Sequence, residues 1–172
     1  YGTDDDETLN GGNKADYISG RGVRDVITGL AQADYLAGND GSDTLFGDTS
    51  NDTLDGGSGN DFIFTGNEDD FARGGLDDDL LKGENGADRL DGDAGNDVLF
   101  GNVGNDSLGG GEGNDSIFAG SDNDVVKGDA DDDYLAGESG NDTLGGDDGN
   151  DEMFGNSGSD VLDGDSGNDT LL

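Results

Sequence analysis

The sequence contains no cysteine, histidine, proline or tryptophan. Without cysteine the chain forms no disulfide bonds, and without cysteine and histidine it lacks the side chains that zinc, iron and copper favour. The same absences exclude thiol chemistry and Ser-His-Asp catalysis. A metal ion bound by this chain therefore has to be held by oxygen atoms.

Basic and hydrophobic residues are scarce. The chain has 7 basic against 43 acidic residues, a formal net charge of −36 and only 28% hydrophobic residues. Such a charge repels nucleic acid, and so little apolar content is typical of a chain that stays disordered without a ligand. No apolar run approaches the roughly 20 residues that span a bilayer. The composition predicts that a cationic partner completes the fold.

The sequence is built instead from a nine-residue repeat. Residues 2–172 divide into 19 consecutive nonapeptides without insertion or deletion. Counting from Gly2, position one is Gly in 17 repeats, with Thr65 and Ala119 as exceptions, and position six is Asp in 18, with Glu7 as the exception. Position eight is large and apolar in every repeat except at Ala72. Such a period predicts a solenoid whose core is formed by the eighth positions.

The first six positions of the repeat indicate which cation is bound. In GGSGND (residues 56–61) and GGEGND (residues 110–115), glycines that tolerate positive φ turn carbonyl groups inward, and an aspartate closes the loop. Carbonyl and carboxylate oxygens suit calcium, with six to eight ligands at roughly 2.3–2.6 Å, whereas magnesium tends to keep its water. The loops therefore predict calcium binding.

These residues resemble the repeats-in-toxin (RTX) calcium-binding nonapeptides, whose pattern is Gly-Gly-x-Gly-x-Asp-x-(large aliphatic)-x, along the whole of residues 2–172. The resemblance implies an all-β fold, a right-handed parallel β-roll solenoid. Six residues of each repeat turn, three form a short strand, and two repeats complete an 18-residue coil, giving about nine and a half coils from 19 repeats. It also implies that each calcium lies between loops of repeats i and i+2, which allows up to about 17 ions.

The predicted sites differ in strength. Gly at positions one and four with Asp at position six marks the ten strongest, whose aspartates are Asp43, Asp61, Asp88, Asp97, Asp106, Asp115, Asp142, Asp151, Asp160 and Asp169. Further metal-binding aspartates are predicted at Asp52, Asp70, Asp79, Asp124 and Asp133. The loop glycines assigned to the sites are Gly57, Gly59, Gly95, Gly104, Gly111, Gly113, Gly140, Gly149 and Gly158.

Several repeats lack the fourth glycine. Beyond the N-terminal repeats, an acidic residue replaces it in four (Glu68, Asp77, Asp122 and Asp131), and these repeats either bind calcium through that carboxylate or bind none. Residues 2–37 are degenerate and carry Lys14, Arg21 and Arg24 in their loops. Either these cations partly replace calcium, or the repeat simply decays at this end. On this ranking, Asp25→Ala is expected to disturb calcium-dependent folding much less than Asp106→Ala.

We interpret residues 2–172 as a single β-roll with a longer internal period. Residues 38–91 and 92–145 are identical at 28 of 54 positions, and residues 146–172 begin a third copy. A block of three coils was therefore duplicated. Because the chain begins at Tyr1 without Met or a signal peptide and stops at a repeat boundary, we interpret it as a piece of a longer protein.

The 18-residue coil assigns odd and even repeats to different sheets, with positions seven and nine pointing outward. Position nine of the odd repeats is largely apolar and includes Phe46, Phe64, Phe100, Phe118 and Phe154, whereas the even repeats carry charged residues there. Two interpretations remain open. The rings form a ladder that stiffens the sheet, or a second copy or a neighbouring domain covers them.

We do not expect an enzyme. General acid/base catalysis needs a concave pocket with separated pKa values, which a regular roll does not offer. Three functions remain, and we rank first an extracellular structural module, calcium-rigidified, in a bacterial surface layer, adhesin or fibre. The second is the calcium-triggered export and folding module of a toxin, protease or lipase, for which the resemblance implies type I secretion. The third is ice binding, but the outward threonines form no continuous array.

Overall fold

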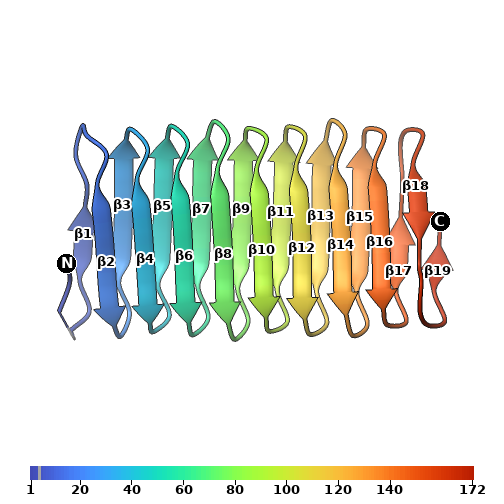
Figure 1. Cartoon of the computed structure of the whole chain (residues 1–172), viewed down its shortest axis with the longest axis horizontal. Helices are drawn as coiled ribbons and strands as arrows, with labels where there is room; N and C mark the ends of the chain where they lie inside the picture. Colours follow the sequence, from blue (N-terminus) through green and yellow to red (C-terminus); the bar gives the residue numbers. More distant parts are fainter. Residues whose placement is uncertain (4) are drawn as a thin grey trace.

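A computed structural model describes residues 1–3 and 5–172, which coil into a parallel β-solenoid of about nine turns (Figure 1). Consecutive strands alternate between two sheets. The ten-stranded sheet contains β1 (Thr8–Asn10), β3 (Val26–Ala31), β5 (Thr44–Thr49), β7 (Phe62–Asn67), β9 (Leu80–Asn85), β11 (Val98–Val103), β13 (Ser116–Ser121), β15 (Tyr134–Ser139), β17 (Glu152–Phe154) and β19 (Thr170–Leu171). The nine-stranded sheet contains β2 (Tyr17–Gly22), β4 (Tyr35–Asp40), β6 (Thr53–Ser58), β8 (Phe71–Leu76), β10 (Arg89–Ala94), β12 (Ser107–Glu112), β14 (Val125–Ala130), β16 (Thr143–Asp148) and β18 (Val161–Asp163).

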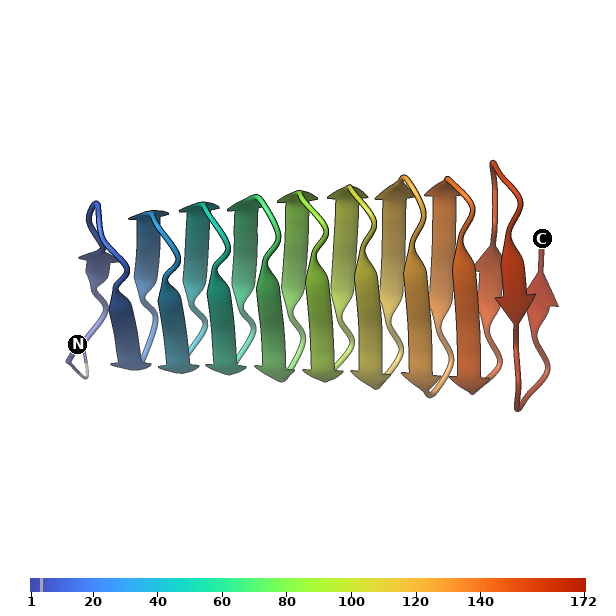
Figure 2. The ribbon, with the colours of Figure 1, turned by 45° about the horizontal axis from the view of Figure 1, so that its top comes forward.

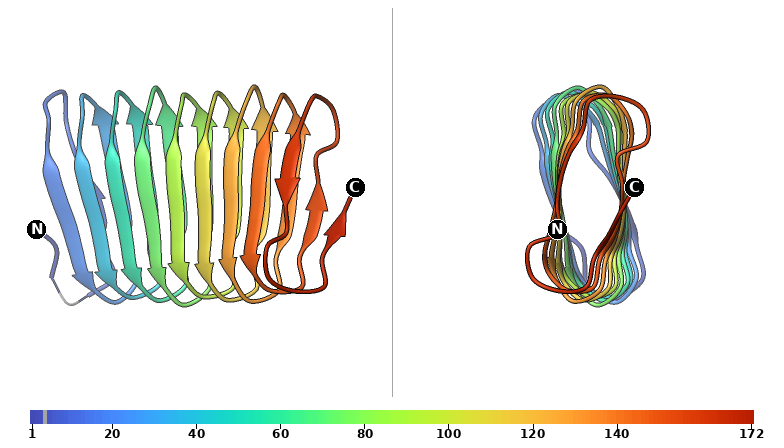
Figure 3. Two further views of the ribbon diagram at one scale, coloured as in Figure 1. Left: turned by 45° about the vertical axis from the view of Figure 1, so that its right-hand side comes forward. Right: turned by 90° about the vertical axis from the view of Figure 1, so that its right-hand side faces the viewer.

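The two sheets face one another across a narrow interior, and the coils stack almost in register along the axis (Figures 2 and 3). Every pairing joins residues 18 apart, as in Leu45 with Ile63 of β5 and β7. The predicted assignment of odd and even repeats to separate sheets is confirmed. The described residues include no helix long and apolar enough to cross a membrane.

The strands are longer than the resemblance implied. A strand such as β5 runs from position seven of one repeat through position three of the next. Its pairing with β7 skips position one and continues at position two, where Asp48 pairs with Gly66. Six residues rather than three therefore belong to each such strand, and only positions four to six lie outside the strands. The prediction of a six-residue loop is wrong because backbone hydrogen bonds between coils capture positions two and three, which side-chain pattern does not reveal.

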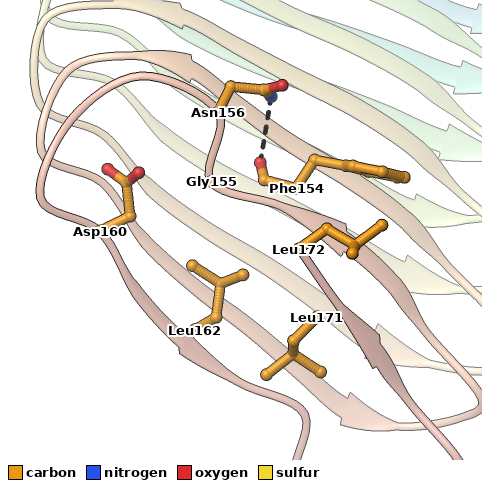
Figure 4. A pocket seen from close by; sticks show the side chains of 7 residues that line it. All are labelled: Phe154, Gly155, Asn156, Asp160, Leu162, Leu171 and Leu172. Carbon is orange, nitrogen blue, oxygen red and sulfur yellow. Dashed lines mark hydrogen bonds between the residues drawn. The ribbon is translucent and has the colours of Figure 1, made fainter.

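The core is one file of eighth-position side chains between the sheets. From Ile27 to Met153 these side chains are 0–2% exposed, which confirms the predicted core. At the C-terminal end the file is open: Leu171 is 43% exposed, and a cavity of about 450 Å³ lies between it, Leu162 and Phe154 (Figure 4). From Ile27 to Met153 the interior is closed by the coil above and the coil below.

From the third repeat onward, positions two and four adopt left-handed backbone angles whether or not they are glycine, with Gly149 as the exception. Gly57 and Gly59 have φ of 113° and 106°, while Leu30 has 80° and Val23 has 74°. Only glycine adopts this region freely, and a β-branched residue there is a clear outlier. The stacked coils therefore impose one loop geometry on repeats whose own sequence disfavours it.

Val23→Gly is expected to stabilise the calcium-loaded protein by about 0.5–1 kcal/mol. The left-handed conformation costs an L-residue about 1–2 kcal/mol, from which the extra backbone entropy that glycine loses on folding must be subtracted. Chemical denaturation at saturating calcium measures the change. Val26→Gly is the matched control, because Val26 is comparably exposed but lies in β3 without a positive φ, and it is expected to destabilise. Equal losses for both variants would contradict the proposed strain.

Aromatic rings form a ladder on the outer face of the ten-stranded sheet. Phe46 stacks on Phe64, and Phe100 on Phe118, each with ring centroids 5.1 Å apart and planes 11° apart. Lys82 fills the step between the two pairs, with Nζ 5.6 Å from the Phe64 ring centre and 5.3 Å from that of Phe100. The ring faces are thus turned towards neighbouring coils, and mainly ring edges face outward.

Candidate metal sites

The sixth-position carboxylates form two rows, one along each edge of the solenoid. Fifteen of them, from Asp25 to Asp151, are only 0–5% exposed. In each row, Oδ1 of one aspartate accepts the backbone N–H of the aspartate 18 residues earlier: Asp61 accepts from Asp43 at 2.7 Å in one row, and Asp106 accepts from Asp88 at 2.8 Å in the other. The preceding coil therefore fixes the orientation of each carboxylate.

The second oxygen of these carboxylates has no partner. Oδ2 is buried without a hydrogen bond in Asp25, Asp34, Asp43, Asp52, Asp61, Asp70, Asp79, Asp88, Asp97, Asp106, Asp115, Asp124, Asp133, Asp142 and Asp151. Burial of a charged oxygen without a counter-charge is costly. It accordingly raises the pKa of Asp61 to about 7 and that of Asp79 to about 8, although a backbone N–H opposes each rise. These rows are therefore built for a bound cation.

A second kind of oxygen faces the same space. A Cβ added to Gly83, at position one, would lie 2.5 Å from Oδ2 of Asp88 and 2.8 Å from the carbonyl oxygen of Gly101 in the next coil. Gly83 has no positive φ, so glycine is needed here for room rather than for backbone angle. Each such repeat brings a carboxylate oxygen and a carbonyl oxygen together, and calcium takes both as ligands.

The structure places the predicted residues in two groups. The thirteen predicted aspartates from Asp43 to Asp151 all lie in the buried rows. Asp160 and Asp169, at the C-terminal end, are partly exposed, but their Oδ1 atoms accept the N–H of the preceding coil at 3.0 and 3.1 Å. Of the predicted loop glycines, all except Gly149 have φ between 106° and 155°.

Sequence reasoning missed two members of the rows. Asp25 and Asp34, in the degenerate repeats, are buried with an unpartnered Oδ2 like the others. The fourth-position glycine was a poor guide, because Val23 and Gln32 adopt the left-handed angle without it. The sixth-position aspartate itself was the better signal. On this geometry the weaker effect expected of Asp25→Ala, relative to Asp106→Ala, has no support.

The first two repeats differ from the rest. Oε2 of Glu7 accepts the N–H of Thr3 at 2.6 Å, and Oδ2 of Asp16 accepts the N–H of Gly12 at 2.8 Å. Their own loops therefore satisfy both carboxylates. Within the described residues, the basic side chains of these loops form one ion pair, Arg24 with the exposed Asp6 at 3.8 Å, and none with a sixth-position carboxylate. The hypothesis that these cations replace calcium has no contact to support it.

A ladder at position five was also missed. Oδ1 of Asn96 accepts the N–H of Asn114 at 3.0 Å, and Oδ1 of Asn114 accepts that of Asp132 at 2.9 Å. Asn105, Asn123 and Asn141 form the corresponding ladder at the other edge. The recurrence of asparagine at position five was visible in the sequence. Its side chains tie each loop to the following coil, in the opposite direction to the sixth-position carboxylates.

Comparison with known protein families matches the RTX calcium-binding nonapeptide repeat over residues 1–36, 21–54, 37–72, 73–108, 109–144 and 145–172. The chain belongs to this RTX family. A comparison with curated proteins finds no match. RTX repeats form a calcium-binding β-roll, and the stacked aspartates of this RTX chain fit that ion.

The fit to calcium depends on both kinds of oxygen. In the part of the chain that the structure describes, no three acidic side chains converge on one point that could hold a metal ion, since each edge carries one buried carboxylate per coil. The RTX loops combine these carboxylates with carbonyl oxygens, as at Gly83, and hard oxygen ligands of this mixture favour calcium over softer metals. The residues that would hold the ions are thus the sixth-position aspartates and the loop carbonyl groups.

Proposed function

We propose that this chain is a calcium-dependent structural rod outside the cell, in a bacterial surface layer, adhesin or extracellular fibre, with no catalytic role of its own. The observation that carries the proposal is the pair of rows that together hold fifteen buried carboxylates, each with one oxygen fixed by the preceding coil and one without a partner. A stack in which every coil needs a counter-charge makes the stiffness of the whole rod depend on the ion.

Calcium supplies positive charge to the buried carboxylate rows. The chain's own residues do the rest: backbone N–H groups hold the carboxylates in place, the eighth-position side chains close the core, and position-one glycines leave room for the carboxylates. With a net charge of −36, the ion-free chain repels itself. Ions that bind the folded state and not the unfolded chain shift the equilibrium to the roll. Scarce calcium inside a cell leaves the chain unfolded, and abundant calcium outside folds it.

The aromatic ladder supports the structural role. Because the rings of Phe46 and Phe64 stack face to face, as do those of Phe100 and Phe118, they add contacts between coils along the rod axis. Phe62, which is 50% exposed, leaves some apolar surface uncovered beside them. We propose that a second copy or a neighbouring domain covers this strip.

The alternative is a calcium-triggered export module of a type I-secreted toxin, protease or lipase. The same charge favours it, because a chain with 43 acidic residues stays extended and exportable while calcium is scarce. Both functions share the folding step, and they differ in whether the folded rod assembles.

The test is a calcium titration of the chelated protein, followed by far-UV circular dichroism and light scattering together. We expect a cooperative change from coil to β-structure as calcium reaches millimolar levels. Rising mass with the transition supports the structural rod, and constant monomer mass supports the export module. The absence of any transition would remove the proposal. Magnesium at the same concentration is the control and is expected to be far less effective.

A further inference from the structure

Two repeats begin with a residue other than glycine, and both lie on the same edge. Thr65 and Ala119 are 54 residues apart and fully buried. The sixth-position aspartates of their repeats, Asp70 and Asp124, belong to one row. In the row on the other edge every repeat begins with glycine. The two edges therefore differ at the position that makes room for the carboxylate.

The side chain of Thr65 fills the space that the oxygens otherwise share. Its Oγ1 donates to the carbonyl oxygen of Gly83 at 2.7 Å, from β7 to β9, and it lies beside the carboxylate of Asp70. One coil further along the same edge, Oδ2 of Asp88 and the carbonyl oxygen of Gly101 are the atoms nearest to the corresponding space at Gly83. At Thr65 a neutral hydroxyl thus occupies this space and engages the carbonyl oxygen.

Oδ2 of Asp70 is buried without a hydrogen bond, as in the rest of its row, so this repeat differs in the occupied space and the engaged carbonyl oxygen and not in its carboxylate. The additional acid of this repeat is already engaged, because Oε2 of Glu68 accepts the N–H of Ser50 in the preceding coil at 2.8 Å. Oε2 of Glu68 is thus engaged with the preceding coil and not with Asp70.

The eighth repeat is also held differently from its neighbours. Its core residue is Ala72, which buries less apolar surface than the leucines paired with it at positions 54 and 90. On the outer face, the guanidinium groups of Arg73 and Arg89 lie 5.5 and 5.4 Å from the Phe71 ring centre, and Arg89 pairs with Asp91 at 2.9 Å. Of these contacts, the one between Arg89 and Phe71 joins two neighbouring coils, beside the position where the core residue is smallest.

We propose that the repeats beginning at Thr65 and Ala119 are ion-free joints in one of the two rows of calcium sites. The inference rests on the proposed calcium binding and names the repeats that bind no ion. The side chain at position one decides whether a repeat binds calcium. One row is continuous, and the other is interrupted twice, three coils apart.

The test counts the calcium ions bound to the folded protein by native mass spectrometry. Thr65→Gly and Ala119→Gly are each expected to bind one ion more than the parent chain, and the double variant two more. Gly83→Thr, on the same edge one coil away, is expected to bind one ion fewer. Thr65→Ala is the matched control: it removes the hydroxyl but keeps Cβ, and its ion count is expected to stay at the parent value.

Circular dichroism confirms that each variant is folded before its ions are counted. If Gly83→Thr does not fold, the two glycine variants still decide the matter. If both variants bind as many ions as the parent chain, and the parent chain binds several, the proposal of ion-free repeats is refuted and the proposed calcium-dependent rod is retained. A gain in Thr65→Ala would also overturn the inference, because space at position one would not be the cause. A parent chain that binds no calcium would refute the proposed function itself.

Discussion

In the absence of calcium, lowering the pH from 8 towards 5 is expected to restore β-structure to the chain. Burial raises the pKa of Asp79 to about 8, that of Asp115 to about 7 and that of Asp97 to about 6, and the other interior members of the rows shift in the same direction. In the unfolded chain these carboxyl groups return to an ordinary value of about 3.9. Between these limits the folded state binds more protons than the unfolded state.

The free energy of unfolding therefore rises as the pH falls through about 8 to 6. The stabilisation is complete only below the unfolded pKa near about 4, and it is lost as the pH rises through the folded values. Because many carboxylates act together, the effect is larger than that of any single substitution. Protons compete with calcium for the same groups, so the folded chain is expected to bind calcium more weakly as the acidity increases.

Far-UV circular dichroism in a chelating buffer, recorded at pH 8, 7, 6 and 5, measures this dependence. Adjacent residues provide matched variants. Asp79→Asn removes a buried group with a raised pKa and is expected to favour the calcium-free fold at pH 8. Asp78→Asn removes an exposed carboxylate whose pKa is lowered by hydrogen bonds from Asn96, and it is expected to give no such gain. A β-content that is greatest at pH 8 would contradict the charge argument.

Leu99→Ala is expected to destabilise the calcium-loaded roll by about 2–5 kcal/mol. Leu99 is fully buried in β11 and is paired in register with Leu81 on one side and Ile117 on the other. Its loss leaves a cavity in a core that is one side chain wide, and no other layer can move in to fill it. Since each coil contacts only its neighbours, the damage weakens both adjoining interfaces.

Thermal and chemical unfolding at saturating calcium measure the loss, and the calcium midpoint is expected to move upward. Leu76→Ala is the control, because Leu76 is 57% exposed at the end of β8 and its truncation is expected to change stability by less than about 0.5 kcal/mol. Similar losses for the two variants would mean that the file of eighth-position residues is not the main source of core stability.

The solenoid could be predicted from the sequence because every repeat places the same residue types at the same positions of the coil. The apolar eighth position and the acidic sixth position identify the core and the buried rows, and the structure places both as expected. The extent of the strands was not predictable in this way. Positions two and three vary in side chain, and it is the backbone of the neighbouring coil that draws them into the sheet, as in the pairing of Asp48 with Gly66.

The candidate sites were predicted less completely, again because the stack overrides local preference. Val23 and Gln32 do not favour the left-handed region, yet the loop around Asp25 and Asp34 keeps the geometry of its neighbours. Conversely, Glu7 and Asp16 have suitable side chains but are satisfied within their own loops. Residue type alone does not report which oxygen atoms are left without a partner, since that depends on contacts made 18 residues away.

The hydrogen bonds at positions five and six give the rod a polarity. Each sixth-position carboxylate accepts a hydrogen bond from the coil before it, as Asp61 does from Asp43. When coils unfold from the N-terminal side, a buried carboxylate therefore loses its hydrogen-bond donor. Peeling from the C-terminal side frees a backbone N–H instead, which water readily solvates. Under tension the two directions of unzipping are therefore not equivalent, and the roll resists being opened from its N-terminal end more strongly than from its C-terminal end.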